Sequence, residues 1–136
     1  MVVEKSLHIL IVDDQDTVLE ILRGFLRNLG FHHVDEAKSA AEALTRLREA
    51  LVSPAGGDPF GLVFSDWNMH SISGLQLLQA VRRDPSLAKT PFIMITGEAS
   101  KDRLAAAVEA GVTSFIVKPF SLESVRKRMV SVLGEF

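Results

Sequence analysis

Short apolar runs recur along the chain, and each is bounded by polar or turn-forming residues. Runs of about four to eight residues that are rich in Val, Ile and Phe predict buried β-strands. Five stretches fit this description: HILIV (8–12), HVDEA (33–37), LVFS (62–65), FIMI (92–95) and SFIVK (114–118). Runs without an internal polar residue, such as FIMI, are typical of strands that are covered on both faces.

Between the strands, apolar residues recur at helical spacing. A first helix is expected in 16–29, where the spacing i, i+4, i+7, i+11 predicts one buried face. The residues of that face are Val18, Leu22, Phe25 and Leu29. Gly30 follows directly, at a position where helices commonly end.

The same pattern predicts four further helices, at 39–51, 74–83, 100–110 and 122–133. Ser39 and Ser121 stand where N-caps are expected, and Gly111 follows the helix at 100–110. The face expected to be buried in 39–51 consists of Ala40, Ala43, Leu44, Leu47 and Leu51. In 122–133 it consists of Leu122, Val125, Met129 and Val132.

Five strand-then-helix cycles predict an α/β fold: a doubly wound, five-stranded parallel sheet with five helices on its two faces. A chain of 136 residues fits a single domain, 1–136. The Pro- and Gly-rich segment 52–61 is expected to be a surface loop at the end of the sheet away from the strands' carboxyl ends. A tolerated insertion is its simplest interpretation.

Composition removes several classes of function. The chain has no cysteine, which excludes disulfides and thiolate metal sites. Its net charge of −2 gives no reason to expect nucleic acid as a partner. No segment resembles a signal peptide, and no apolar stretch approaches the roughly 18 residues that a membrane span needs. We therefore expect no membrane insertion and a cytoplasmic protein.

Polar residues stand at the carboxyl ends of four of the five predicted strands. Asp13 and Asp14 follow the first strand, Asp66 the third and Thr96 the fourth, while Lys118 ends the fifth. Ligands of open parallel sheets bind outside the carboxyl ends of the strands. Three carboxylates, a hydroxyl and an ammonium are therefore expected to meet at one edge of the sheet.

This set of groups suits phosphoryl chemistry. Two carboxylates about 4 Å apart repel each other by roughly 4 kcal/mol at an effective dielectric constant of about 20, and a Mg²⁺ ion would offset that repulsion. One aspartate could then act as a nucleophile and form an aspartyl phosphate. Taken singly, each residue has a commoner explanation, such as a helix cap, a turn or a solvated side chain. Their occurrence together, each at a strand end, favours a site.

The motifs VDDQD, SDWNMHSISGLQLL, ITGEA and EAGVTSFIVKPF, in this order, resemble the receiver domains of two-component response regulators. The resemblance covers nearly the whole chain and is strongest to the single-domain, CheY-like chemotaxis type. It implies a flavodoxin-like sheet with strand order 2-1-3-4-5. It also implies a single receiver domain without an attached output domain. This strand order is inferred from the family resemblance, because the hydrophobic pattern alone does not specify it.

The resemblance also implies roles for individual residues. Asp66 matches the phosphoacceptor, and Asp13 and Asp14 match the acids that hold Mg²⁺ together with Asp66. The backbone carbonyl of Asn68 is expected to complete that metal site. Thr96 and Lys118 match the residues that contact the phosphoryl group.

Further positions match residues that tune or transmit the signal. Phe115 stands where the family has an aromatic switch residue. Asn68 and Glu98 match positions that flank the phosphoryl group and are associated with its rapid loss. The bond between Lys118 and Pro119 is often cis in the family.

Two residues depart from the family pattern. His70 replaces the proline that usually follows Met in DWNMP, which puts the rigidity of that loop in doubt. Phe115 replaces the tyrosine of the chemotaxis archetype and cannot donate a hydrogen bond. This second difference weakens the specific expectation of a flagellar-motor target.

The implied function is that of a two-component response regulator. A sensor histidine kinase donates the phosphoryl group, and a downstream protein, with the flagellar motor switch as one candidate, reads the phosphorylated state. The expected partner face consists of Lys101, Leu104, Val108, Phe115 and Arg128. The basic run at 126–128 could meet an acidic partner, or it could complement a helix dipole at a helix C-terminus.

Three alternatives remain open at this stage. The first is a phosphate sink or phosphorelay intermediate outside motor control, which the site residues do not distinguish from motor control. The second is a phosphohydrolase of the haloacid-dehalogenase type, although the chain has no room for a cap domain. The third is a nucleotide- or flavin-binding module, although VDDQD has no glycine to cradle a phosphate.

Overall fold

The computed structural model describes residues 3–52, 58–69, 72–98 and 100–136. Within these residues the strands are β1 (Ile9–Val12), β2 (Val34–Ala37), β3 (Leu62–Asp66), β4 (Phe92–Thr96) and β5 (Ser114–Val117). The helices are α1 (Asp16–Asn28), α2 (Ala40–Val52), α3 (Gly74–Arg83), α4 (Lys101–Glu109) and α5 (Leu122–Leu133). Each predicted element is therefore present, with ends that differ by at most one residue.

The strands form one parallel sheet in the order β2-β1-β3-β4-β5. This confirms the α/β class and the strand order that the family resemblance implied. The register pairs Val12 with Ser65 and Asp66 with Ile95, so the central strands finish side by side. The residues that follow these strands consequently share one edge of the sheet.

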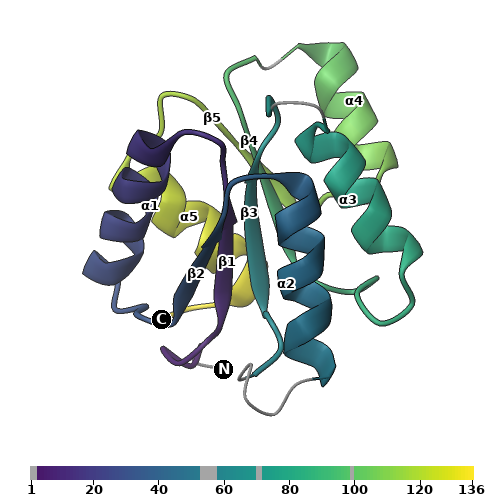
Figure 1. Cartoon of the computed structure of the whole chain (residues 1–136). Coiled ribbons are helices and arrows are strands. Elements are labelled where there is room, and N and C mark those ends of the chain that lie inside the picture. The colour runs from purple at the N-terminus through teal and green to yellow at the C-terminus, as the bar shows by residue number, and fades with distance from the viewer. Residues whose placement is uncertain (1–2, 53–57, 70–71, 99) are drawn as a thin grey trace.

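The helices form a layer on each face of the sheet, with α1 and α5 on one side and α2, α3 and α4 on the other (Figure 1). Each face has its own apolar core. Ile9 and Ile11 of β1 point to the core shared with α1 and α5, whereas Leu10 and Val12 point to the core shared with α2 and α3. This alternation explains why the strand is apolar throughout.

The buried face of α1 is rotated from the predicted one. Leu19, Leu22 and Leu26 are the buried residues of this helix, whereas Val18 is half-buried. Phe25 lies at the edge of the core, with its ring edge-on to Phe120 at 6.0 Å between ring centres. The predicted face is therefore confirmed at Leu22, while Phe25 and Leu29 pack only at the margin of the core. Both sets of residues are apolar at helical spacing, and only packing on the sheet selects between them.

In α2 the predicted face is confirmed except at its last residue. Ala40, Ala43 and Leu47 are buried, but Leu51 is 38% exposed and Ala50 takes the buried position instead. In α5, Val125 and Met129 are buried as expected, with Leu122 and Val132 half-buried.

The predicted helix ends are confirmed. The Ser39 hydroxyl accepts the backbone N–H of Glu42 at 3.1 Å, and the Ser121 hydroxyl accepts that of Ser124 at 3.1 Å. Gly30 and Gly111 adopt φ values of 99° and 90°, a conformation that glycine reaches without steric cost.

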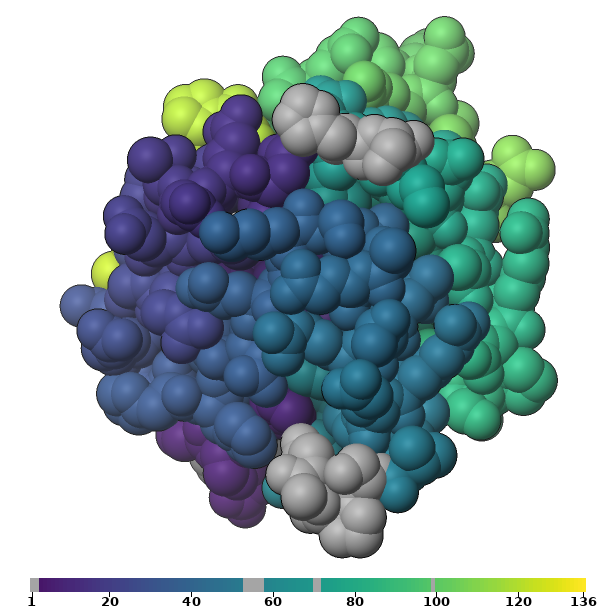
Figure 2. All heavy atoms as spheres, viewed as in Figure 1, coloured from purple at the N-terminus to yellow at the C-terminus, as the bar shows by residue number. Residues whose placement is uncertain are grey.

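The end of loop 52–61 lies at the amino ends of the strands, as predicted. Gly61 donates its N–H to the carbonyl of His8 at 2.8 Å, and the carbonyl of Asp58 lies 2.6 Å from Nδ1 of His8. Val52 belongs to α2, and residues 53–57 are outside the described residues. In the view of Figure 2, the blue atoms of α2 lie across the centre of the face.

His8 precedes β1 instead of beginning it, so the predicted strand was one residue too long. His8 is 3% exposed, and its ring lies between the rings of His33 and Phe60, at 3.9 and 3.7 Å between centres. Nε2 of His8 lies 2.7 Å from Oδ2 of Asp35. His8 therefore links the start of β1 to β2 through Asp35 and to the segment before β3 through Asp58.

None of the helices in the described ranges is long and apolar enough to span a bilayer.

Candidate functional site

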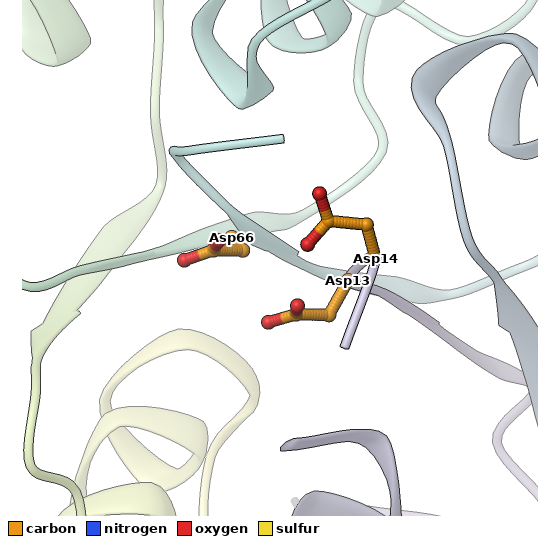
Figure 3. A group of neighbouring side chains, drawn as sticks. All are labelled: Asp13, Asp14 and Asp66. Atoms are coloured by element: carbon orange, nitrogen blue, oxygen red, sulfur yellow. The ribbon is translucent and has the colours of Figure 1, made fainter. Parts of the chain in front are cut away.

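Asp13, Asp14 and Asp66 meet at the carboxyl ends of β1 and β3 (Figure 3). Asp13 directly follows β1 and donates its N–H to the carbonyl of Ala37 at 3.1 Å, so the ladder with β2 continues through it. Asp66 is the last residue of β3. One ligand oxygen from each of the three carboxylates lies within 4.8 Å of the others.

Two of the three carboxylates are buried, and this burial raises their pKa values. Asp13 is 2% exposed, and loss of solvation, with the nearby charge of Asp66 adding to it, raises its pKa to about 6. Burial also raises the pKa of Asp66, against the opposing effect of Lys118. The cluster thus carries negative charge that water does not fully solvate.

The donor set fits a divalent cation. Oδ1 of Asp13 accepts the N–H of Gln15 at 2.9 Å, but Oδ2 is buried and has no hydrogen-bond partner within the described part of the chain. A buried carboxylate oxygen without a partner is costly, and a cation bound there would satisfy it. Oxygen ligands of this kind are those that Mg²⁺ prefers.

Lys118 and Thr96 complete the edge as the strand-end pattern predicted. Nζ of Lys118 lies 3.0 Å from Oδ1 of Asp66, and the Lys118 N–H donates to the carbonyl of Thr96 at 2.7 Å. Thr96 is the last residue of β4 and is 2% exposed. The peptide bond between Lys118 and Pro119 is cis, as expected.

The predicted tuning residues lie at the outer rim of the site. Asn68 and Glu98 are both exposed. The backbone N–H of Glu98 donates to the Thr96 hydroxyl at 3.1 Å, and that hydroxyl donates to the Glu98 carbonyl at 3.0 Å. His70, the departure from the family's proline, lies outside the described residues.

Arg103 reaches this rim from α4, and the sequence reasoning missed it. Its guanidinium contacts Asn68, Thr96, Glu98 and the ring of Trp67. A faint signal was available, because Arg103 lies on the first turn of the helix that follows Glu98. Nothing in the spacing indicates that its side chain turns back toward β3, so only the tertiary structure reveals the contact.

The expected partner face is partly exposed. Lys101 and Arg128 are exposed, Val108 is 65% exposed, and Leu104 and Phe115 are half-buried. The Arg128 guanidinium lies over the Phe115 ring, 5.8 Å from its centre. The structure therefore joins the predicted switch aromatic to α5.

The basic run at 126–128 does not complement a helix C-terminus. α5 continues to Leu133, so these residues lie in its middle, and its last turn has no basic residue. Arg126 instead pairs with Glu123 at 3.2 Å, while Lys127 and Arg128 are exposed. The dipole interpretation was wrong because the helix runs one full turn beyond the basic residues.

The family model described as response regulator receiver domain matches residues 9–130. The chain is 38% identical to the Vibrio cholerae chemotaxis protein CheY-3 over 128 residues, which cover 94% of this chain and 92% of that protein. It is 36% identical to the Pseudomonas aeruginosa chemotaxis protein CheY over 124 residues, covering 91% and 94%. The solved structure of the Vibrio cholerae chemotaxis protein CheY4 matches with a TM-score of 0.83 at 29% identity, covering 94% of this chain and 99% of that chain.

Proposed function

Because this chain belongs to the response regulator receiver domain family, we propose that it accepts a phosphoryl group on Asp66 and signals through phosphorylation-dependent protein binding. CheY-like receiver domains are signalling domains and not classical enzymes, which argues against the phosphohydrolase alternative. The observation that carries the proposal is the position of Asp66: a 5% exposed carboxylate that pairs with Lys118 beside two further acids.

The phosphoryl donor in this proposal is a phosphohistidine of a sensor histidine kinase, since receiver domains of this family are phosphorylated by such kinases. A carboxylate oxygen of Asp66 attacks the phosphorus atom, and the bond between phosphorus and the ring nitrogen breaks. The electron pair of that bond returns to the imidazole. Asp66 thereby becomes a mixed anhydride, the aspartyl phosphate.

The side chains around Asp66 have separate tasks in this step. Asp13, Asp14, Asp66 and the backbone carbonyl of Asn68 are the residues that would hold Mg²⁺, which offsets the charge of the carboxylates and of the incoming phosphoryl group. Lys118 holds the Asp66 carboxylate in place and offers an ammonium to the phosphoryl oxygens. The Thr96 hydroxyl can donate to a phosphoryl oxygen once it leaves the Glu98 carbonyl.

The output in this proposal is a change of the face formed by α4, β5 and α5. The phosphoryl group adds about −1.5 to −2 charges at Asp66 and draws Thr96 and Lys118 toward it. Within α4, Ala107 is the one buried residue, so this helix is held by little apolar contact and can shift at low cost. Phe115 and Arg128 would transmit the shift to α5.

Chemotaxis is the process that this proposal favours, because relatives at 36–38% identity are chemotaxis proteins. The flagellar motor switch is then the first target to test.

The deciding experiment combines intact mass and fluorescence. The protein is titrated with Mg²⁺ and then given acetyl phosphate, while the emission of Trp67, the only tryptophan, is followed. We expect a Mg²⁺-dependent change in emission and the mass of one added phosphoryl group. Asp66→Asn should prevent the added mass, and Asp102→Asn, which removes an exposed carboxylate on α4, should not. No added mass in the wild-type protein would contradict the proposed phosphoacceptor role.

A further inference from the structure

The geometry points to Arg103 as a positioning residue that slows the loss of the phosphoryl group from Asp66. This inference rests on the proposed function. Arg103 belongs to neither the acidic cluster nor the strand ends, yet its side chain joins the two loops on either side of the site. These are the loop after β3, with Trp67 and Asn68, and the end of β4 with the loop after it, where Thr96 and Glu98 lie.

The contacts of Arg103 use its whole guanidinium group. Nη2 donates to Oδ1 of Asn68 at 3.2 Å, and Nε lies 3.2 Å from Oε2 of Glu98. Nη1 donates more weakly to the Thr96 hydroxyl, at 3.5 Å. The guanidinium carbon lies 4.8 Å from the centre of the Trp67 ring. A planar group with donors on several sides can satisfy all four partners at once, and an ammonium cannot.

The start of α4 fixes where Arg103 lies. The Ser100 hydroxyl accepts the backbone N–H of Arg103 at 3.3 Å, which caps the helix and holds the backbone of this residue. Its side chain is 25% exposed, against 62% for Glu98. Arg103 is therefore the more enclosed partner of this ion pair, and Glu98 is drawn toward it.

Asn68 and Glu98 are the two side chains expected to influence how fast the phosphoryl group is lost. In that reaction the oxygen of a water molecule forms a bond to phosphorus. The bond between phosphorus and the Asp66 oxygen breaks, which regenerates the carboxylate and releases phosphate with the two protons of the water. Arg103 engages the amide oxygen of Asn68 and one carboxylate oxygen of Glu98. These contacts fix both side chains and make the two engaged oxygens poorer acceptors for that water.

Removal of Arg103 should therefore release both side chains, open the rim and accelerate dephosphorylation. We expect Arg103→Ala to shorten the half-life of the aspartyl phosphate roughly three- to tenfold, the range that one or two lost contacts produce in a rate. Arg103→Lys keeps the charge but loses the planar group, so it should restore only part of the wild-type half-life. Trp67 emission should change in both variants before any phosphodonor is added.

The measurement is the decay of the phosphorylated protein after removal of acetyl phosphate, followed by intact mass in Mg²⁺ buffer. Arg83→Ala is the matched control, because it removes one exposed guanidinium from α3 and should leave the decay unchanged. A wild-type half-life in Arg103→Ala, a longer one, or full restoration by Arg103→Lys would each overturn the inference.

A double-mutant cycle separates an effect through the rim from general loosening of α4. In an Asn68→Ala, Glu98→Ala background, Arg103→Ala should change the decay rate much less than in the wild type, because its partners are already gone. An equal effect in both backgrounds would show that Arg103 does not act through them. If the wild-type protein takes up no phosphoryl group, the proposed function fails, whereas the emission of Trp67 in unphosphorylated Arg103→Ala still tests the contact itself.

Discussion

At the scale of single residues, the buried carboxylate of Asp13 stores an unfavourable interaction that a cation would relieve. Oδ2 of Asp13 lacks a hydrogen-bond partner in the described ranges, and the residue is 2% exposed. Proteins rarely leave such a group without compensation unless it has a functional purpose. The unsatisfied oxygen therefore lowers the stability of the cation-free protein, and we attribute its presence to the function of the site.

This cost predicts how the stability of the cation-free protein depends on pH. The pKa of Asp13 rises from 3.8 to about 6 on folding, so the folded state holds this proton more tightly than the unfolded state. Stability should fall as the pH rises from about 4 to about 6, by up to roughly 1.4 kcal/mol per pH unit from this group, and should then level off. Urea denaturation of the wild type and of Asp13→Asn, measured in EDTA at each pH, isolates the contribution of the Asp13 carboxyl to the free energy of unfolding.

Addition of Mg²⁺ should recover stability above pH 6 in the wild type and less in Asp13→Asn. A difference between the two proteins that grows with rising pH in EDTA, in favour of the wild type, would contradict this account.

Gly74 is the second residue on which the site depends. A methyl group at this position would collide with the carbonyl oxygen of Asp66 and lie 3.0 Å from Sδ of Met94. The Gly74 N–H also donates to the carbonyl of Trp67 at 2.9 Å, so α3 begins in direct contact with the end of β3.

We expect Gly74→Ala to lower the free energy of unfolding by about 1–3 kcal/mol, because the backbone of β3 must shift, and to slow phosphorylation of Asp66. Gly24→Ala is the control: a methyl group there meets no heavy atom within 4 Å, and alanine favours the interior of α1 by up to about 1 kcal/mol. Equal stability of the two variants would show that the close approach at Gly74 can relax.

At the scale of elements, the helices differ in how they are held. α3 and α5 each begin with a capping box. In each box the serine hydroxyl, of Ser73 or Ser121, accepts the backbone N–H of the residue three positions later, and the serine's own N–H donates to that residue's side chain. α4 has a serine cap but buries only Ala107. The helix that carries Arg103 is thus the one whose position depends most on polar contacts.

Removal of the α5 cap should cost about 1 kcal/mol in the free energy of unfolding, because Ser121→Ala leaves the Ser124 N–H without its acceptor. Ser131→Ala, an exposed position inside the same helix, should change the stability by less than about 0.5 kcal/mol. Thermal unfolding of both variants provides the comparison, and equal melting temperatures would mean that water replaces the cap without loss.

At the scale of the whole molecule, the sheet separates two apolar cores that share its strands. Leu26 of α1 lies in one core and Leu78 of α3 in the other, and both are fully buried. Because the central strands β1, β3 and β4 each contribute residues to both cores, neither core should stay folded without the other.

Leu26→Ala and Leu78→Ala should each lower the free energy of unfolding by about 2–5 kcal/mol and keep a single transition in urea with an unchanged slope. Ile21→Ala, at a position that is 50% exposed, should cost less than either. Two separate transitions in one of the leucine variants, seen by Trp67 emission and circular dichroism, would show that the layers unfold independently.

The sequence by itself determined the elements and most of the candidate site. Strand and helix periods, serine caps and the glycines after helices are local signals, since each depends on neighbouring residues. Asp13, Asp66, Thr96 and Lys118 were predictable because strand ends in a parallel sheet must share an edge. The family resemblance supplied the strand order, which local pattern leaves open.

Only the tertiary structure decided which of two apolar stripes of α1 is buried, that His8 lies between His33 and Phe60, and that Arg103 turns back to the rim of the site. Each of these depends on residues that are distant in the chain and on the rotation of an element about its own axis. Helical spacing fixes that rotation only to within neighbouring apolar positions, because side chains of similar hydrophobicity gain similar free energy from burial. The shape of the sheet surface on which the helix packs decides which of these side chains are buried.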